Sequence, residues 1–182
     1  MSRWRPRAQR VAAIVAMVTV AAALVPAPTS AGRRYLEWGE DDDVSRGSLL
    51  QAMNEQRALR GLPPLHLNVR LDAAAADRIH DMFEFRYFAH VAPDGTEPFV
   101  WVRQRGYRYA RVGENLAMGQ TAARQVVQQW MASPAHRANI LGDYRDAGIA
   151  IASGVPTGRS GGCTFVAMYG RQDGEPRLVS RR

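Results

Sequence analysis

Near the C-terminus, residues 163–169 read Cys-Thr-Phe-Val-Ala-Met-Tyr. Successive side chains of a β-strand point to opposite faces of its sheet. One face then carries Cys163, Phe165, Ala167 and Tyr169. The other carries Thr164, Val166 and Met168. Because both faces are apolar, such a strand needs a covering layer on each side. The stretch predicts a buried strand in the middle of a layered domain.

Further elements are expected on the N-terminal side of this strand. Residues 148–152 predict a second strand, joined to the first by a loop rich in Gly, Ser and Pro. Apolar residues spaced by three and four predict a helix from about Ser48, which Gly61 and the following prolines end, and another over 69–85. Helices in the first half and strands in the second predict an α+β fold, a three-layer α-β-α sandwich.

The middle of the chain predicts two more helices. The turn Pro93-Asp94-Gly95 precedes Thr96, which is expected to cap a short helix that ends at Gly106. Thr121 is expected to cap the next helix. Its core-facing stripe follows helical spacing and comprises Ala123, Val126, Val127, Trp130 and Met131.

The N-terminus has the layout of a signal peptide. Four arginines and no acid stand in the first ten residues, and the apolar stretch 11–25 follows. This stretch is shorter than the roughly 20 residues that a membrane-spanning helix needs. We expect cleavage before Gly32 and a secreted, extracytoplasmic protein with no transmembrane segment after processing. A retained N-terminal anchor is the alternative.

The 182 residues suffice for one domain, and 46% hydrophobic with 23% charged residues is typical of a folded soluble protein. The expected layout is a signal peptide at 1–31, a linker at 32–46, the folded domain at 47–172 and a basic disordered tail at 173–182. We expect a monomer.

The charge of the chain argues against a nucleic-acid partner. The formal net charge is +7, but four of the 24 basic residues leave with the signal peptide and none of the 17 acids does, so 20 minus 17 leaves +3. The basic residues are all arginines and are scattered along the chain. The basic tail can touch an anionic wall polymer or lipid surface, although a solvated end is the simpler interpretation.

Cys163 is the only cysteine of the chain, so no internal disulfide can form. Outside the cytoplasm an unpaired cysteine is buried, joined to another molecule, or a metal ligand. Stability must therefore come from packing.

The four histidines are not equal candidates for a functional site. His66 is interpreted as an exposed strand or turn residue and His80 as a residue at the rim of the second helix, so neither enters the site. His90 is different, because the turn at 93–95 places it on the shoulder of a loop.

His136 is expected in the first turn of a helix that Ser133 caps and Pro134 begins. The positive end of that helix disfavours imidazolium and leaves a neutral ring that can bind a metal or accept a proton. The alternative is a hydrogen-bonding residue that only holds the loop.

Glu114 stands at an expected strand start, in Val-Gly-Glu-Asn-Leu-Ala at 112–117, 24 residues after His90 and 22 before His136. These separations far exceed the local spacing of a metal-binding helix. Spacing by itself therefore does not establish a site.

Several ordered segments nevertheless resemble the signature segments of bacterial CAP-domain proteins. They are Phe88-Ala89-His90 with Pro93-Asp94-Gly95, the stretch 113–117, and the stretch from Trp130 to Leu141, together with Asn54-Glu55-Gln56-Arg57 and 61–65. The resemblance covers about Ser48 to Gly170. It is specific because the segments occur together and in order.

The resemblance implies an α-β-α fold with a large surface cleft. In the eukaryotic branch, which includes cysteine-rich secretory proteins, venom antigen 5 and plant pathogenesis-related proteins, this cleft holds two His and two Glu and can bind zinc. His90 matches the first His and Glu114 the first Glu. Ser133 stands where the second Glu would be, and Cys163 stands near the place of the second His.

The predicted cleft residues are therefore His90, Glu114 and His136, the last from the bacterial pattern. The same three are the predicted ligands of a divalent metal such as zinc. Cys163 is a possible fourth ligand, since a thiolate binds zinc well, and a small buried residue is the simpler alternative.

Two functions fit this cleft. The leading hypothesis is a binding module that works outside the cytoplasm on a lipid, cell-wall or protein ligand, with or without a metal. The rival is a secreted metal-dependent, peptidase-like hydrolase in which Glu114 is the third ligand or the catalytic base. Cys163 as a nucleophile with a histidine base is a third interpretation, which its position in the middle of a strand disfavours.

Overall fold

The computed structural model describes residues 44–158 and 161–178, which lie within one compact unit of the chain. The expected signal peptide at 1–31, its cleavage before Gly32, most of the expected linker and residues 179–182 lie outside the described residues.

Five helices and four strands form the described part of the domain. In chain order they are α1 (Arg46–Ala58), β1 (His66–Leu67), α2 (Val69–Glu84), α3 (Phe99–Gln104), β2 (Tyr109–Gln120), α4 (Ala123–Ala132), α5 (Pro134–Ile140), β3 (Asp146–Ser153) and β4 (Cys163–Gln172).

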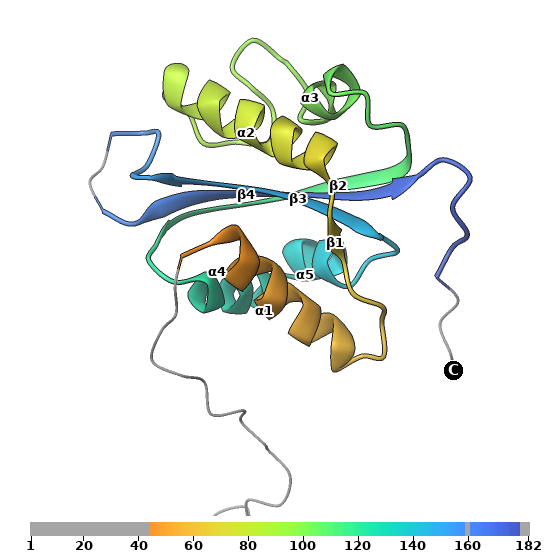
Figure 1. The fold of residues 1–182 in the computed structure, drawn as a ribbon. Coiled ribbons are helices and arrows are strands. Elements are labelled where there is room, and N and C mark those ends of the chain that lie inside the picture. The colour runs from red at the N-terminus through yellow and green to blue at the C-terminus, as the bar shows by residue number, and fades with distance from the viewer. Residues whose placement is uncertain (1–43, 159–160, 179–182) are drawn as a thin grey trace, which may run out of the picture. The chain divides into compact units, whose positions relative to one another are not determined.

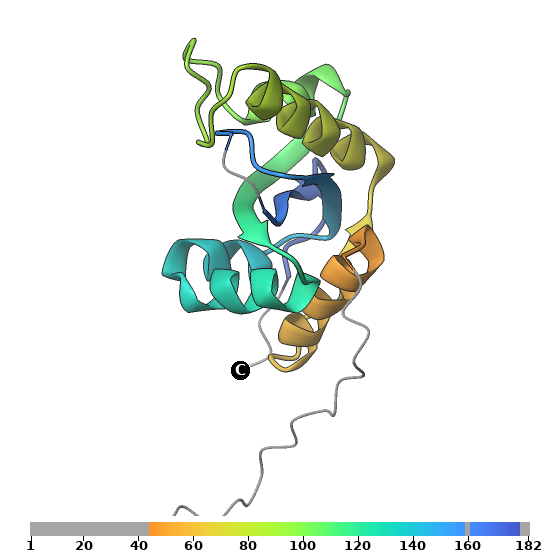
Figure 2. The same cartoon turned by 90° about the vertical axis from the view of Figure 1, so that its left-hand side faces the viewer.

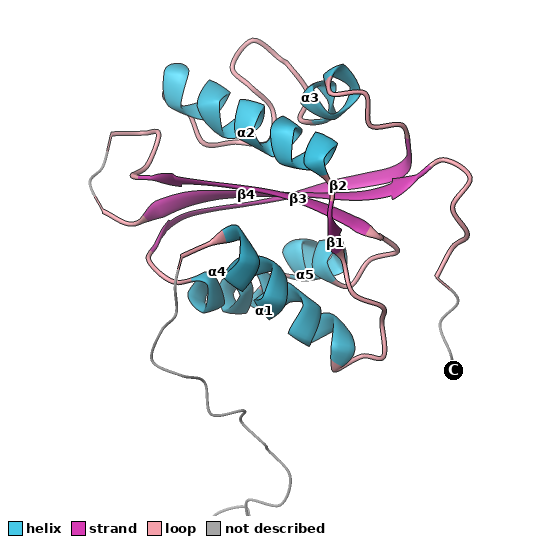
Figure 3. Ribbon diagram, viewed as in Figure 1, coloured by secondary structure: helices cyan, strands magenta, loops and turns pink. Residues whose placement is uncertain are grey.

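The four strands form one mixed sheet in the order β1-β3-β4-β2. β1 runs parallel to β3, and β4 runs antiparallel to both β3 and β2. Helices α2 and α3 cover one face, and α1, α4 and α5 cover the other (Figures 1 and 3). The perpendicular view in Figure 2 shows the same separation into layers. The predicted α-β-α sandwich is confirmed.

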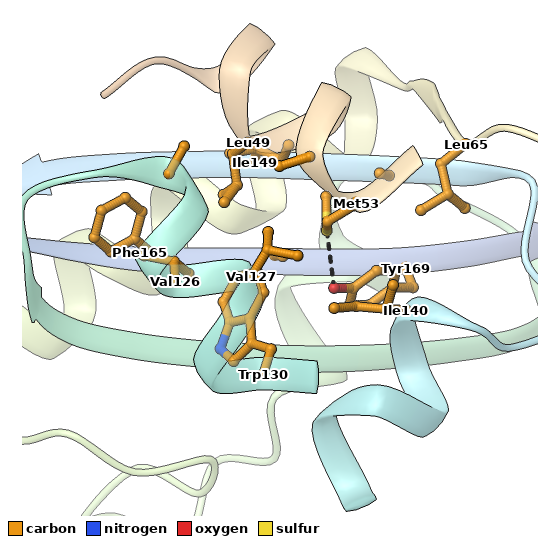
Figure 4. Close-up of a cluster of buried hydrophobic side chains, with 14 of the residues drawn as sticks. Leu49, Met53, Leu65, Val126, Val127, Trp130, Ile140, Ile149, Phe165 and Tyr169 are labelled. Atoms are coloured by element: carbon orange, nitrogen blue, oxygen red, sulfur yellow. Dashed lines mark hydrogen bonds between the residues drawn. The ribbon is translucent and has the colours of Figure 1, made fainter. Parts of the chain in front are cut away.

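The alternation of β4 divides the interior into two cores. Phe165, Ala167 and Tyr169 pack into the α1 core, between the sheet and α1, α4 and α5 (Figure 4). Val166 and Met168 pack into the α2 core, between the sheet and α2 and α3. All five side chains are fully buried, so the two apolar faces predicted for this stretch are confirmed.

Helix α2 is fixed against β3 by a close contact. A Cβ on Gly148 would lie 2.0 Å from the carbonyl carbon of Leu71, so a glycine is needed at this point. The N–H of Ile149 donates to the Asp72 carboxylate at 2.8 Å. Together these contacts set the height of α2 over the sheet and turn Arg78, two helical turns after Leu71, toward the strands.

Strand β2 was not predicted beyond a strand start at Glu114, and it is the longest strand of the described residues. One edge pairs with β4 from residue 109 to residue 120. On the outer edge, side chains satisfy the backbone: Tyr144 donates to the Val112 carbonyl, Asn139 to that of Glu114 and Trp130 to that of Leu116. These donors replace a further strand and protect the edge from pairing with another chain.

The helix ends differ from the predicted caps. α3 begins at Phe99 behind Pro98 and α4 begins at Ala123 behind Ala122, and neither helix has a side-chain cap. Thr96 instead belongs to the predicted turn, where its N–H donates to Asp94 at 2.9 Å. The predictions of Thr96 and Thr121 as N-caps are therefore wrong, because local turn bonding and the start of helical backbone one or more residues later take precedence.

Both ends of the domain extend past the predicted limits. α1 starts at Arg46, inside the predicted linker, because Ser45 and Ser48 form a reciprocal capping box. At the other end, the expected tail is hydrogen-bonded through residue 178. Leu178 N–H donates to Asp143 at 2.8 Å and Gln172 N–H to Glu175 at 2.9 Å. Residues 173–178 thus contact the domain, and the disorder expected for the tail stays a prediction.

No helix within residues 44–158 and 161–178 is long and apolar enough to cross a lipid bilayer.

Trp130 tests the α1 core. Its side chain is fully buried and its Nε1–H donates to the Leu116 carbonyl at 3.0 Å. Trp130→Ala should lower the free energy of unfolding by roughly 3–5 kcal/mol, because it leaves a large cavity. Phe85→Ala, which truncates a 61% exposed aromatic, should cost less than about 1 kcal/mol. Urea unfolding of both variants measures the difference, and equal losses would contradict this description of the core.

Candidate functional site

A buried arginine on α2 is the centre of the site. The side chain of Arg78 is fully buried, and its guanidinium lies 4.7 Å from the Trp101 ring centre. It donates to the Glu114 carboxylate at 3.2 Å, to the Tyr87 hydroxyl, and to the backbone carbonyls of Ala89 and His90. One side chain thus joins α2, β2 and the loop that carries His90.

Glu114 is the partner of Arg78 and lies in β2, opposite Met168 of β4. Its side chain is 1% exposed. Oε2 accepts from Arg78 and Oε1 lies 2.7 Å from Nδ1 of His90. Both carboxylate oxygens are therefore engaged by groups of the protein itself, and the buried negative charge is balanced by a buried guanidinium.

His90 is the most accessible member of the site. Its side chain is 53% exposed, although Nδ1 contacts the buried Glu114. A carboxylate only accepts hydrogen bonds, so Nδ1 carries the hydrogen, and the neutral ring then has an unprotonated Nε2. The Arg78 bond to the His90 carbonyl, at 2.8 Å, fixes the backbone of the same residue. The predicted loop position of His90 is confirmed, and both ends of the residue are held.

Tyr87 and Asp81, both half-buried, complete the hydrogen-bond network around Arg78. The Tyr87 hydroxyl donates to Asp81 and accepts from Arg78, and the Asp81 carboxylate is 3.5 Å from the guanidinium. Burial, followed by the hydrogen bond to Asp81, raises the pKa of Tyr87 to about 12. The hydroxyl therefore stays protonated at neutral pH and continues to link the loop to α2.

His136 lies in the first turn of α5, with Ser133 at the N-cap position and Pro134 first in the helix, as predicted. The Ser133 side chain makes no capping bond. Burial, and then the positive charge that His90 carries when it is protonated, lower the pKa of His136. The expected neutral ring is therefore supported, but by desolvation and a neighbouring histidine instead of the helix terminus.

Two asparagines hold α5 against β2. Asn115 is fully buried and donates to the His136 carbonyl at 3.0 Å and to the Tyr169 hydroxyl at 3.1 Å. Asn139 donates to the Asn115 side chain at 2.8 Å and to the Glu114 carbonyl. His136 is thus fixed through its backbone, and its Nδ1 is buried without a hydrogen-bond partner among the described residues.

The remaining candidates lie away from this network. Cys163 begins β4 and pairs with Gln120 and Ser153, whereas Glu114 pairs with Met168. Five residues of strand separate Cys163 from Met168, about 17 Å. Cys163 packs against the α1 core, so it is not a fourth ligand beside Glu114 and not a nucleophile for His90.

His66 and His80 lie outside the site, as predicted. His66 is exposed in β1, and His80 is exposed on α2, where it is 3.6 Å from Glu84.

The predicted metal does not fit this arrangement. Both oxygens of Glu114 and Nδ1 of His90 are already hydrogen-bonded. The Arg78 guanidinium already neutralises the Glu114 carboxylate, so a dication bound there would lie beside a buried positive charge. Within residues 44–158 and 161–178, no three His, Cys, Asp or Glu side chains are grouped as metal ligands. Zinc binding by His90, Glu114 and His136 stays a prediction.

The large cleft likewise stays a prediction. Two hollows of the surface are lined by other residues, one between α2 and α3 around Asp77 and Trp101, and one around Arg103 and Tyr109. Neither hollow includes His90, Glu114 or His136, so the hydrogen bonds given above are what describes the histidine site.

The Arg78–Glu114 pair predicts strong energetic coupling. Arg78→Met leaves the Glu114 carboxylate buried without its counter-charge and should cost about 3–5 kcal/mol of unfolding free energy. Adding Glu114→Gln removes that charge and should recover at least about 1 kcal/mol. Arg105→Met, which breaks an exposed pair with Asp77, is the control and should cost less than about 1 kcal/mol. Additive losses in urea unfolding would contradict the coupling.

The lowered pKa of His136 predicts a stability change with pH. The unfolded chain takes up a proton at His136 more readily than the folded chain, so acidification from about pH 7 to pH 5 should lower the unfolding free energy. His136→Asn should make the melting temperature less dependent on pH across this window. His80→Asn, at an exposed position of α2, should keep the wild-type dependence. An unchanged pH dependence in His136→Asn would contradict the burial of a neutral ring.

Comparison with known sequences places the domain in a family. Residues 50–169 match CAP, the cysteine-rich secretory protein family. The uncharacterized protein YkwD of Bacillus subtilis (strain 168) is 37% identical over 93 residues, which are 51% of this chain and 36% of YkwD. The match thus spans little more than a third of the length of that relative.

Solved structures share the fold at lower identity. An outer surface protein from Borrelia burgdorferi superposes with a TM-score of 0.61 at 22% identity, over 69% of this chain and 90% of that one. An extracellular SCP-domain protein from Bacillus anthracis gives 0.60 at 20% identity, over 69% and 40% of the two chains. The family match extends over most of the described domain, and the fold agrees with it. This chain belongs to the CAP, or cysteine-rich secretory protein, family.

Proposed function

We propose that this chain is an extracytoplasmic binding module whose ligand contacts the imidazoles of His90 and His136. The observation that carries the proposal is the half-exposed ring of His90, held at Nδ1 by a carboxylate that is itself buried against Arg78. Burying two charges costs several kcal/mol unless they pair well, and apolar side chains can fill such a space without that cost. A buried ion pair that holds one exposed ring in place, despite its desolvation cost, is typical of a functional site.

The chemistry of the ring indicates what it recognises. Nε2 of neutral His90 accepts a hydrogen bond, so the ligand presents a donor, such as a hydroxyl or amide N–H. Cell-wall polymers, lipid headgroups and protein surfaces all carry such donors, and these three remain the partner classes.

Two observations support the proposed location outside the cytoplasm. The Arg-rich start and the apolar stretch 11–25 have the layout of an export signal. Among proteins of the same fold, that from Bacillus anthracis is described as extracellular and that from Borrelia burgdorferi as an outer surface protein.

The same geometry favours a hydrolase as the second candidate. A carboxylate that orients Nδ1 of a histidine leaves Nε2 able to take a proton from water while the water oxygen attacks a carbonyl carbon. The protonated His90 then returns the proton to the leaving group. His90 is the base in this scheme, because Glu114 is 1% exposed and already bonded at both oxygens. The expectation that Glu114 itself is the base does not suit this geometry.

Co-sedimentation tests the binding function, with isolated bacterial cell walls in one arm and phosphatidylglycerol vesicles in the other. Loss of one neutral hydrogen bond costs about 0.5–1.5 kcal/mol, so His90→Ala should weaken binding roughly 2- to 13-fold. His80→Ala changes an exposed histidine outside the site and should bind as the wild type does.

Each result separates the candidates. Binding that His90→Ala and His80→Ala weaken equally would show that the site is not involved. Breakdown of the walls that persists in a metal chelator and disappears in His90→Ala would establish the hydrolase instead. If the chain binds neither walls nor vesicles, a protein surface is the remaining partner class. Cross-linking on intact cells with the same two variants tests that class.

A further inference from the structure

A second feature of the surface is a hollow at the start of β2. A hollow of about 350 Å³ opens between the end of α3 and the start of β2, lined by Arg103, Gly106, Tyr107, Arg108, Tyr109 and Asp173. This volume is within the range of small-ligand sites, which begins at about 300 Å³. Tyr109 and Glu114 are five residues apart on the strand, about 17 Å, so the hollow is separate from the histidine site.

Two of its guanidinium groups have no carboxylate partner among the described residues. Arg103 and Arg108 are exposed, and neither makes an ion pair within that part of the chain. Arg105, between them in sequence, is bound by Asp77. Arg103 is held in place by its bond to the Tyr109 hydroxyl at 3.1 Å. The hollow therefore presents two positive groups that an anion can pair with.

The floor of the hollow is rigidly held. Tyr107 is 2% exposed and its hydroxyl donates to Asp146 at 2.7 Å. It lies so close to Gly170 that a Cβ there would come within 2.3 Å of the Tyr107 hydroxyl. Gly106 has a φ of +72°, which turns the chain from α3 toward β2. A preformed floor reduces the ordering cost of binding a small ligand.

The other lining groups restrict the class of ligand. Asp173 offers a carboxylate that accepts from hydroxyl groups and repels a bare anion. Tyr109 is half-buried and offers part of an aromatic ring to an apolar surface. A ligand that satisfies all three kinds of group carries one negative charge, several hydroxyls and a C–H face.

We propose that this hollow binds an acidic sugar, a hexose unit with a carboxylate or phosphate group. The anionic group pairs with Arg103 and Arg108, the hydroxyls donate to Asp173, and the C–H face of the ring packs on Tyr109. The proposal is independent of the function of the histidine site, because it shares no residue with it.

Calorimetric titration of the full chain tests the proposal with a matched pair of sugars. Glucuronic acid and glucose differ only at C6, which is a carboxylate in the first and a CH2OH group in the second. Wild type should therefore bind the first and show at least about tenfold weaker binding of the second, from the loss of a charge-assisted pair. Arg108→Gln should weaken glucuronate binding to a similar extent. Arg105→Gln, whose partner Asp77 lies outside the hollow, should bind as the wild type does. Binding should also weaken at 0.5 M salt, because the pairs are exposed.

Three results would overturn it. One is the absence of glucuronate binding by wild type. Thermal melting verifies that wild type and Arg108→Gln are folded under the conditions of the titration. Another is an equal loss in Arg105→Gln and Arg108→Gln, which would show only general electrostatic attraction. The third is binding of inorganic phosphate as tight as that of glucuronate and glucose 6-phosphate, which would show an anion site without sugar recognition.

Discussion

The buried ion pair between Arg78 and Glu114 is the constraint on which the arrangement of this domain depends. A guanidinium and a carboxylate, both withdrawn from water, are tolerated only in contact and with their remaining hydrogen-bonding groups satisfied. Contact requires that α2 lie at one height over the sheet, which the missing Cβ of Gly148 allows. The guanidinium also binds the carbonyls of Ala89 and His90, so the loop cannot move away without leaving donors unpaired. The same ion pair therefore fixes both the packing of α2 on the sheet and the position of His90.

Strand β2 transmits this constraint to the opposite layer. Glu114 turns toward α2, and the next residue, Asn115, turns toward α5 and holds the His136 carbonyl. Side chains of Asn139, Trp130 and Tyr144 occupy the outer edge of the strand where a neighbouring strand would otherwise pair. Glu114 thus holds the ring of His90, and the next residue holds the backbone of His136, from one edge strand that both helical layers stabilise. Burial, and then the positive charge that His90 carries when it is protonated, lower the pKa of His136.

The sequence predicted the elements whose patterns are regular. The alternation of 163–169 correctly implied two covering layers, and the spacing of Val126, Val127 and Trp130 correctly placed one helix face in the core. Only a strand start at Glu114 was predicted for β2, because its edge bonds come from residues 14 to 32 positions away. His90, Glu114 and His136 were identified by resemblance, but the role of Arg78 was overlooked. A signal existed: Arg78 stands three residues after Ala75 and four before Met82, on the buried stripe of α2. An arginine on such a stripe requires a buried acidic partner.

In the proposed function, Glu114 holds the neutral ring of His90 by its Nδ1 and leaves Nε2 to the ligand. Long-range proton–nitrogen NMR spectra of the histidine rings at pH 8 test it most directly, because the two ring nitrogens of a neutral imidazole differ in shift according to which one carries the hydrogen. We expect a protonated Nδ1 and an unprotonated Nε2 for His90. A ring protonated at Nε2, or one averaging between the two forms as a freely solvated histidine does, would contradict it.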